Sequence, residues 1–197
     1  MARVVFTPPA KVLIRLHVTA DMVTIAGTLA TSAAALWLFP TGHLAIGAIV
    51  IAVVACGDAL DGTMARLTKH STRWGAFLDS TLDRVADSAV FAGLTIYFAL
   101  HQDMVGLIAA VAAGAFGGVV PYARARAEGL GMKASGGIAE RSDRLILTLL
   151  AAGITGFGAS KWVLIVALMV VSLAAAFTVI QRARAVWLQG AQSTAPQ

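Results

Sequence analysis

Six long apolar runs fill most of this chain, and they constrain its fold more than any other feature. Only short polar segments separate the runs. They cover residues 22–40, 43–66, 76–100, 104–127, 140–158 and 161–185. A helix needs about 20 apolar residues to cross the hydrocarbon core of a bilayer, so six such helices use nearly all of the 197 residues. The runs therefore predict an all-α integral membrane protein with six transmembrane helices and no soluble domain.

The composition of the chain supports this prediction. Hydrophobic residues make up 58% of the chain and charged residues 13%, and the mean hydropathy is +0.81. Soluble domains contain about 25% charged residues, which excludes an ordinary soluble enzyme, a nucleic-acid-binding domain and a disordered chain. The single cysteine, Cys56, lies within an apolar run. An internal disulfide and a cysteine-based metal site are therefore excluded as well.

The two ends of the chain differ from the apolar runs. Residues 1–20 mix basic and apolar side chains, which predicts a short N-terminal amphipathic helix on the membrane surface. We expect the membrane domain to span residues 21–187 and residues 188–197 to form a disordered tail. With six spans, the basic residues gather on one side, only Lys161 lies on the other, and Arg84 lies just inside the third span. Because basic loops stay in the cytoplasm, this side of the cell membrane, with both termini, is predicted to be cytoplasmic.

Five aspartates lie where the second apolar run ends and the third begins. They are Asp58, Asp61, Asp79, Asp83 and Asp87. A charged group within a span costs at least about 2.5 kcal/mol, so each of these carboxylates needs a partner. The first two are spaced i,i+3 and the next two i,i+4, so each pair projects from one helix face. We expect the second and third helices to pack as antiparallel neighbours, which brings the two pairs together near the cytoplasmic surface.

Four converging carboxylates repel one another unless cations neutralise them. Two divalent cations supply the matching charge, and a ligand set of oxygen atoms alone favours Mg²⁺ or Mn²⁺. Such ions keep positions open for phosphate oxygens, and a pair of them can clamp an in-line displacement. Gly62 lets a ligand approach the backbone, and the Arg66 guanidinium matches a phosphate. Simple Asp–Arg pairs at the interface are the competing interpretation for any one aspartate, but they do not explain four aspartates in this spacing.

The same segment carries an extended motif. It reads D-x-x-D-G-x-x-A-R over residues 58–66 and G-x-x-x-D-x-x-x-D over residues 75–83. The motif resembles the signature of the CDP-alcohol phosphotransferases at every fixed position, and the six-helix plan extends this resemblance over nearly the whole chain. Enzymes of this family are integral membrane proteins that join a CDP-linked lipid or alcohol to a second alcohol and release CMP.

The resemblance also implies roles for individual residues. Asp58, Asp61 and Asp79 would hold one metal ion, and Asp58, Asp79 and Asp83 would hold a second. Asp83 would also act as the general base toward the acceptor hydroxyl. Two Mg²⁺ ions are expected, with Mn²⁺ as the alternative. The implied contacts of CDP-diacylglycerol are Asp21, Met22, Val23, Thr24, Gly62, Arg66 and Thr72, and Ala20 stands where the family usually has a proline.

A basic segment between Tyr122 and Arg144 bears on the second substrate. Its pattern R-A-R-A-E followed by G-G-x-x-E-R-x-x-R resembles the actinobacterial phosphatidylinositol phosphate synthases. This resemblance implies transfer of the phosphatidyl group of CDP-diacylglycerol to 1D-myo-inositol 3-phosphate. A cationic pocket suits such a phosphorylated acceptor. The implied acceptor-binding residues are Arg124, Lys133, Ser135, Arg141, Arg144, Arg182 and Arg184.

Several alternatives stay open. Glycerol 3-phosphate as acceptor would make the protein a phosphatidylglycerophosphate synthase, which also needs a cationic pocket. The basic segment alone also fits positive-inside topology and contact with anionic lipids. A cation transporter is the remote alternative, although its carboxylates should line a path through the membrane rather than cluster at one depth. The Gly114 to Gly118 spacing is a small-xxx-small motif and, with the resemblance, predicts a homodimer. Asp87 lies outside the signature and is expected to be a buried partner for an arginine or a polar group on a neighbouring helix rather than a metal ligand.

Overall fold

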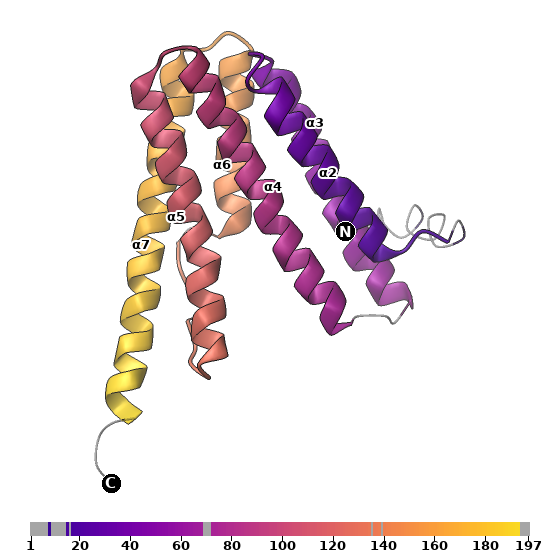
Figure 1. Cartoon of the computed structure of the whole chain (residues 1–197), viewed down its shortest axis with the longest axis vertical. Coiled ribbons are helices and arrows are strands. Elements are labelled where there is room, and N and C mark those ends of the chain that lie inside the picture. Colours follow the sequence, from indigo (N-terminus) through magenta and orange to yellow (C-terminus); the bar gives the residue numbers. More distant parts are fainter. Residues whose placement is uncertain are drawn as a thin grey trace.

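The described part of the chain is all-helical (Figure 1). The computed structural model describes residues 8, 15, 17–68, 72–134, 136–138 and 140–193, and the side chains of residues 58–68, 192 and 193 lie outside this description. Its helices are α2 (Ala20–Leu38), α3 (Leu44–Thr68), α4 (Arg73–Leu100), α5 (Met104–Gly129), α6 (Arg141–Gly156) and α7 (Lys161–Ser193). Each coincides with one of the six predicted apolar runs, and the largest difference in position is at the end of α7.

Short polar side chains fix where three of the helices begin. The Thr19 hydroxyl accepts a hydrogen bond from the Met22 amide at 3.2 Å at the start of α2. Thr72 does the same for Gly75 at 2.9 Å in α4, and Asp103 for Gly106 at 3.1 Å in α5. Ser, Thr and Asp are favoured at this position because they satisfy amide groups that have no partner within the helix.

Three of the described helices are long and apolar enough to cross a membrane. They cover Ala20–Leu38, Met104–Gly129 and Lys161–Ala191, and α3 adds a shorter apolar stretch over Leu44–Gly57. Large apolar side chains such as Leu29 and Leu173 are mostly exposed on their outer faces. Exposed apolar surface of this extent is typical of proteins that contact lipid or a partner, so the helices fit an integral membrane protein.

Helix α2 lies between α3 and α4 and packs against both (Figure 1). The approach to α4 is close, because a Cβ atom added at Gly93 would collide with the Ala35 carbonyl oxygen of α2. Among the described residues, α3 and α4 are not one of the closely packed pairs; α3 packs on α2 and α6 instead. Among the described residues, the predicted direct packing of the second and third helices is not found, and the side chains at the end of α3 that carries Asp58 and Asp61 lie outside the description.

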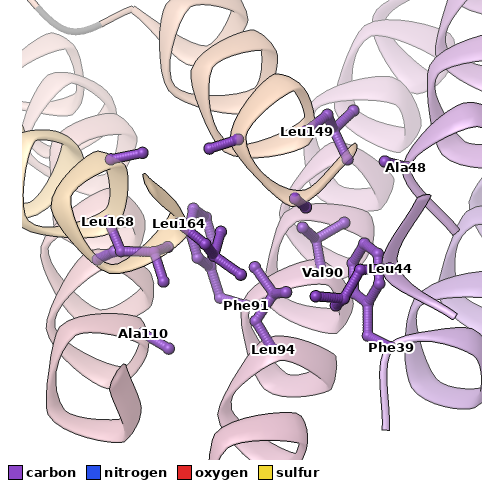
Figure 2. Packing of buried hydrophobic residues seen from close by; sticks show 14 of the residues in the cluster. Phe39, Leu44, Ala48, Val90, Phe91, Leu94, Ala110, Leu149, Leu164 and Leu168 are labelled. Carbon is purple, nitrogen blue, oxygen red and sulfur yellow. The ribbon is translucent and has the colours of Figure 1, made fainter. Parts of the chain in front are cut away.

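The hydrophobic core lies toward the end of the bundle where three tight turns join the helices (Figures 1 and 2). Phe39, Leu44, Phe98 and Leu164 are among its fully buried side chains, and each lies within a few residues of one of these turns. On the outside of the same end, the Lys161 amine lies 2.7 Å from Asp103 Oδ2. This ion pair joins the α4–α5 turn to the start of α7. Toward the other end, the helices diverge (Figure 1).

The C-terminal helix is longer than the sequence predicts. Helix α7 ends at Ser193, so most of the tail predicted over residues 188–197 is helical, and residues 194–197 lie outside the described part. The extension is anchored, because the Gln189 side chain makes two hydrogen bonds with the Lys133 backbone in the α5–α6 loop. Most of the surface helix predicted over residues 1–20 also lies outside the described residues.

Candidate functional site

A polar cavity of about 660 Å³ lies between α4, α5, α6 and α7 in the half of the bundle where the helices diverge. Its charged lining residues are Asp79, Asp83, Arg84, Arg124, Glu128, Glu140, Arg141, Arg144 and Arg182. Charged groups at membrane depth are rare and mark functional sites. The cavity is therefore the first candidate for the site at which a charged substrate reacts.

Two of the four signature aspartates lie in the described part of this cavity. Asp79 and Asp83 are one turn apart on α4 and both line it, as their i,i+4 spacing predicts. Asp58 and Asp61 are in α3, among the residues whose side chains lie outside the description. The described side chains contain no group of three or more carboxylates, imidazoles or thiols that could hold a metal. The predicted four-aspartate metal site thus remains a prediction, with two ligands placed on one wall of the cavity.

Arg141 bridges two carboxylates of α4. Its Nη1 atom lies 2.9 Å from Asp83 Oδ1, and its Nε atom donates to Asp87 Oδ1 at 3.0 Å. Arg84 approaches the same two residues more loosely, at 3.7 Å from Asp83 Oδ2 and 3.9 Å from Asp87 Oδ2. The expectation that Asp87 pairs with an arginine is therefore confirmed. Charge-assisted contacts of this length are among the stronger polar interactions in proteins, so the three side chains hold one another in place.

Two of the predicted acceptor arginines, Arg144 and Arg182, are buried at the cavity wall, with 4% and 9% of their surface exposed. Arg182 is oriented by backbone carbonyls, because its Nε donates to the Gly136 oxygen at 3.1 Å and its Nη1 to the Val120 oxygen. The Arg144 Nε atom lies against Gly117, where a Cβ atom would be 3.5 Å away. Both guanidinium groups are therefore fixed charges facing a cavity rather than mobile surface groups.

The remaining acceptor residues are distributed less uniformly than expected. Arg124 lines the cavity and pairs with Glu128 at 2.8 Å. Lys133 and Arg184 are exposed and are not among the described residues that line it. Arg184 follows Arg182 by two positions, and residues two apart do not share a helix face. Ser135 lies outside the described residues.

The predicted nucleotide contacts gather where α2 and α4 begin. A Cβ atom at Gly75 would lie 3.3 Å from Thr72 Oγ1 and 3.7 Å from Asp21 Oδ1, so these two residues flank the same glycine. Thr24 lines a small inner cavity together with Asp83 and Asp87. Met22 and Val23 lie in the same first turn of α2. Gly62 and Arg66 belong to the part of α3 whose side chains are not described.

An apolar groove of about 560 Å³ runs between α3 and α6. Leu145, Leu149 and Phe157 are among its lining residues, and Arg141 lies at its polar end. Arg141 thus borders the polar cavity, the small inner cavity and the apolar groove. The sequence analysis did not predict this groove, because its walls come from helices almost 100 positions apart in the chain.

Four polar residues in or beside the site were not predicted as site residues. Glu128 and Glu140 line the cavity, and the i,i+4 spacing of Arg124 and Glu128 was a usable signal for their pairing. Arg84 lies beside the metal-site aspartates, next to the signature rather than within it. Gln189 holds the α5–α6 loop, and nothing in its sequence surroundings indicated this contact.

Known proteins resemble this chain over most of its length. The sequence model of CDP-alcohol phosphatidyltransferases matches residues 17–189. The phosphatidylinositol phosphate synthase of Mycolicibacterium smegmatis is 43% identical over 182 residues, which cover 91% of this chain and 82% of that protein.

Two crystal structures of the Mycobacterium tuberculosis phosphatidylinositol phosphate synthase are also similar. The structure with CDP-DAG bound superposes with a TM-score of 0.89 at 41% identity, covering 92% of this chain and 93% of that one. The structure in complex with manganese and citrate gives the same TM-score and identity, covering 92% and 88%. These matches extend over both the helical bundle and the residues around its polar cavity. The chain therefore belongs to the CDP-alcohol phosphatidyltransferase family.

Proposed function

We propose that this protein transfers the phosphatidyl group of CDP-diacylglycerol to a hydroxyl of 1D-myo-inositol 3-phosphate, giving phosphatidylinositol phosphate and CMP. One observation carries the proposal: a single cavity has signature aspartates of α4 on one wall and arginines of α5, α6 and α7 on the others. The aspartates match the donor chemistry of the family, and the arginines match an anionic acceptor. The relatives named above as phosphatidylinositol phosphate synthases support the same acceptor.

The donor set on α4 fits a hard divalent cation. Asp79 and Asp83 present carboxylate oxygens from one helix face into the cavity, and Mg²⁺ and Mn²⁺ favour such ligands. Together with Asp58 and Asp61, they would hold two Mg²⁺ ions, with Mn²⁺ as the alternative. When bound, the two ions would neutralise the pyrophosphate of the donor and the charge that develops on CMP.

The residues of the chain itself supply binding and proton transfer. Asp83 takes the proton from the attacking inositol hydroxyl. The Arg141 guanidinium holds one carboxylate oxygen of Asp83 in place. The acceptor oxygen forms a bond with the phosphorus that carries diacylglycerol. The bond from this phosphorus to the bridging oxygen of the pyrophosphate breaks, and CMP leaves. Arg124, Arg144 and Arg182 bind the acceptor phosphate and keep its hydroxyl facing the donor.

The lipid part of the donor has a separate place. The apolar groove between α3 and α6 suits acyl chains, and it meets the polar cavity at Arg141. The nucleotide part would lie near Asp21 and Thr72, where α2 and α4 begin. This arrangement places the scissile phosphates at the boundary between the polar and apolar regions. A lipid donor and a water-soluble acceptor can then meet without either leaving its preferred surroundings.

We also propose that all six helices span the cell membrane, with both termini and the cavity on the cytoplasmic side. Helix α4 has 28 residues and α6 has 16, and their polar ends lie at the cavity. In a Cys56→Ala background, a cysteine in place of Arg184 should react with a membrane-impermeant thiol reagent only from the cytoplasmic side. A cysteine in place of His101 should react only from the outside. Labelling of both positions from the same side would contradict this topology.

The Gly114 to Gly118 spacing that predicts a homodimer lies partly against other helices of the same chain. A Cβ atom at Gly114 would lie 3.0 Å from Phe91 Cβ of α4, and Gly118 lines the polar cavity. Gly114 therefore serves a contact within one copy of the chain, whereas a Cβ atom at Gly118 would meet nothing within 4 Å. The homodimer stays a prediction of the family resemblance, and the mass of the detergent-solubilised protein by light scattering tests it.

The test of the proposed function is CMP release by the purified protein with CDP-diacylglycerol and Mg²⁺. Inositol 3-phosphate, free inositol, glycerol 3-phosphate and serine would be supplied separately. We expect turnover with inositol 3-phosphate and at most a small fraction of that rate with the others. Turnover with glycerol 3-phosphate alone would keep the donor chemistry and reassign the acceptor. No CMP release with any acceptor would overturn the proposal and favour the transporter alternative.

A further inference from the structure

We infer that Asp87 is a positioning residue for the metal site. By sharing the Arg141 guanidinium, it keeps that arginine from neutralising Asp83 and so leaves Asp83 available to a divalent cation. The inference rests on the proposed function, because Asp83 is the ligand and base of that reaction. It concerns a residue that lies outside the family signature and one turn beyond Asp83 on α4.

Asp87 is placed to act on Arg141 and not on substrate. It lines the small inner cavity but is not among the described residues that line the polar cavity, whereas Arg141 and Asp83 border both. Its side chain is 16% exposed, less than that of Asp83 at 23%. Among the described residues, Asp87 is linked to Asp83 through the arginines that contact both, and Arg141 makes the shorter contacts.

The contact distances show that the arginine is shared. The Arg141 Nε atom donates to Asp87 at 3.0 Å, and its Nη1 atom lies 2.9 Å from Asp83. One unit of positive charge therefore faces two carboxylates at nearly equal distance. Arg84 approaches the same two carboxylates only at 3.7 and 3.9 Å, so it neutralises their charge less than Arg141 does.

The consequence for cation binding follows from competition. An arginine in contact with Asp83 opposes any cation that needs the same carboxylate oxygens. While Asp87 also pairs with the Arg141 guanidinium, the arginine repels a cation at Asp83 only weakly. If Asp87 loses its charge, a larger share of the Arg141 charge acts on Asp83, and the affinity of the site for a divalent cation falls.

A double-mutant cycle on Mn²⁺ affinity tests this inference. Mn²⁺ alone would be titrated into the full-length purified protein, without either substrate, and free Mn²⁺ would be measured by electron paramagnetic resonance. We expect Asp87→Asn to raise the Kd for Mn²⁺ at least threefold. We expect the same substitution in an Arg141→Met background to change the Kd by less than twofold, because the competing charge is gone.

The comparison separates positioning from plain electrostatics. If Asp87 acted only as a nearby negative charge, Asp87→Asn would weaken Mn²⁺ binding equally in both backgrounds, and that result would overturn the inference. Asp143→Asn is the matched control, since it removes a carboxylate from the first turn of α6 and should leave the Kd within twofold. Asp87→Glu keeps the charge and should retain most of the affinity, which guards against misfolding of the asparagine variant.

The same proteins separate this inference from the proposed function. Wild-type protein that shows the Arg141-dependent Mn²⁺ effect but releases no CMP with any acceptor would contradict the function and leave the positioning role standing. Wild-type protein that is active with inositol 3-phosphate, with equal Mn²⁺ losses in both backgrounds, would contradict only the positioning role. If the wild-type protein is active, a saturating Mn²⁺ concentration should restore the rate of CMP release by Asp87→Asn to within twofold of the wild-type rate.

Discussion

The side-chain amide of Gln189 pairs with the backbone of Lys133 through two hydrogen bonds. The Lys133 N–H donates to Gln189 Oε1 at 2.9 Å, and Gln189 Nε2 donates to the Lys133 carbonyl oxygen at 2.6 Å. The contact joins the last turns of α7 to the α5–α6 loop, 56 positions earlier in the chain. Arg182 holds the same loop at Gly136. The loop that precedes Arg141 and Arg144 is therefore fastened at two points by α7.

Replacing Gln189 by alanine should loosen this loop. Each lost hydrogen bond contributes about 1 kcal/mol, so the loop would populate positions in which α6 and its arginines are less well placed. We expect the KM for the acceptor to rise several-fold, with the KM for CDP-diacylglycerol unchanged within twofold. Gln181→Ala is the control, because Gln181 is exposed on the same helix. Equal increases in both KM values would argue against a specific effect on the acceptor side.

Asp83→Asn should remove turnover while preserving donor binding. The amide cannot take the proton from the acceptor hydroxyl, and loss of a general base typically costs about 10²- to 10⁴-fold in rate. CMP release would fall by at least about 100-fold, whereas binding of CDP-diacylglycerol, measured with a labelled donor, would remain detectable. Ser88→Ala, at an exposed position on the same helix, should keep wild-type rates. Full activity of Asp83→Asn would remove Asp83 from the role of base.

Arg124 and Arg126 offer a matched test of the acceptor pocket. Both side chains are exposed, but only Arg124 is among the described residues that line the cavity. Arg124→Ala should raise the KM for inositol 3-phosphate about tenfold, equivalent to about 1.4 kcal/mol, with less effect on the donor. Arg126→Ala should stay within twofold for both substrates. Steady-state kinetics of the two variants side by side would check this, and equal effects would indicate general attraction of anions by the basic surface.

The ion pair between Asp103 and Lys161 predicts a pH dependence of stability. The hydrogen bond from Lys161, with help from the Gly106 amide, lowers the pKa of the Asp103 carboxyl from its usual value of 3.8. Because the pKa is lower in the folded protein, the stabilisation is fully present above the unfolded value and is lost as the pH falls through the folded value. Wild type should therefore have a higher Tm than Lys161→Gln at pH 5 to 8.

This difference in Tm should shrink once the pH falls below about 4. Thermal unfolding of both proteins across this range, in one detergent and at constant ionic strength, measures it. A difference that grows on acidification would contradict the assigned sign. Raising the salt concentration should reduce the gap at neutral pH, since the lysine is exposed to solvent.

The sequence predicts the helices well because an apolar run of membrane length permits little else. Both the all-helical architecture and the placement of Asp79 and Asp83 on one face of α4 follow from spacing alone. The choice of neighbouring helices does not. The packing of α2 against α4 depends on close approaches such as Gly93 against Ala35, and no pattern in either segment specifies its partner.

The same limit explains which site residues could be assigned. The contact between Asp87 and Arg141 joins residues 54 positions apart, so sequence could predict that Asp87 has a basic partner but not which one. Arg182 and Arg184 are equivalent by charge, and only the rotation of α7 distinguishes the one that reaches the cavity. The pairing of Gln189 with a loop backbone carries no sequence signal at all, because any residue supplies the same backbone groups.

The separation between the buried core and the polar cavity bears on how this kind of enzyme changes its substrates. The side chains that hold the bundle together lie toward the end with the tight turns, and the arginines of the polar cavity lie where the helices diverge. Among them Arg124 is exposed, so its substitution alters the chemistry of the cavity without disturbing the buried core. A change of acceptor can therefore come from the cavity wall while the packing that holds the helices together stays as it is.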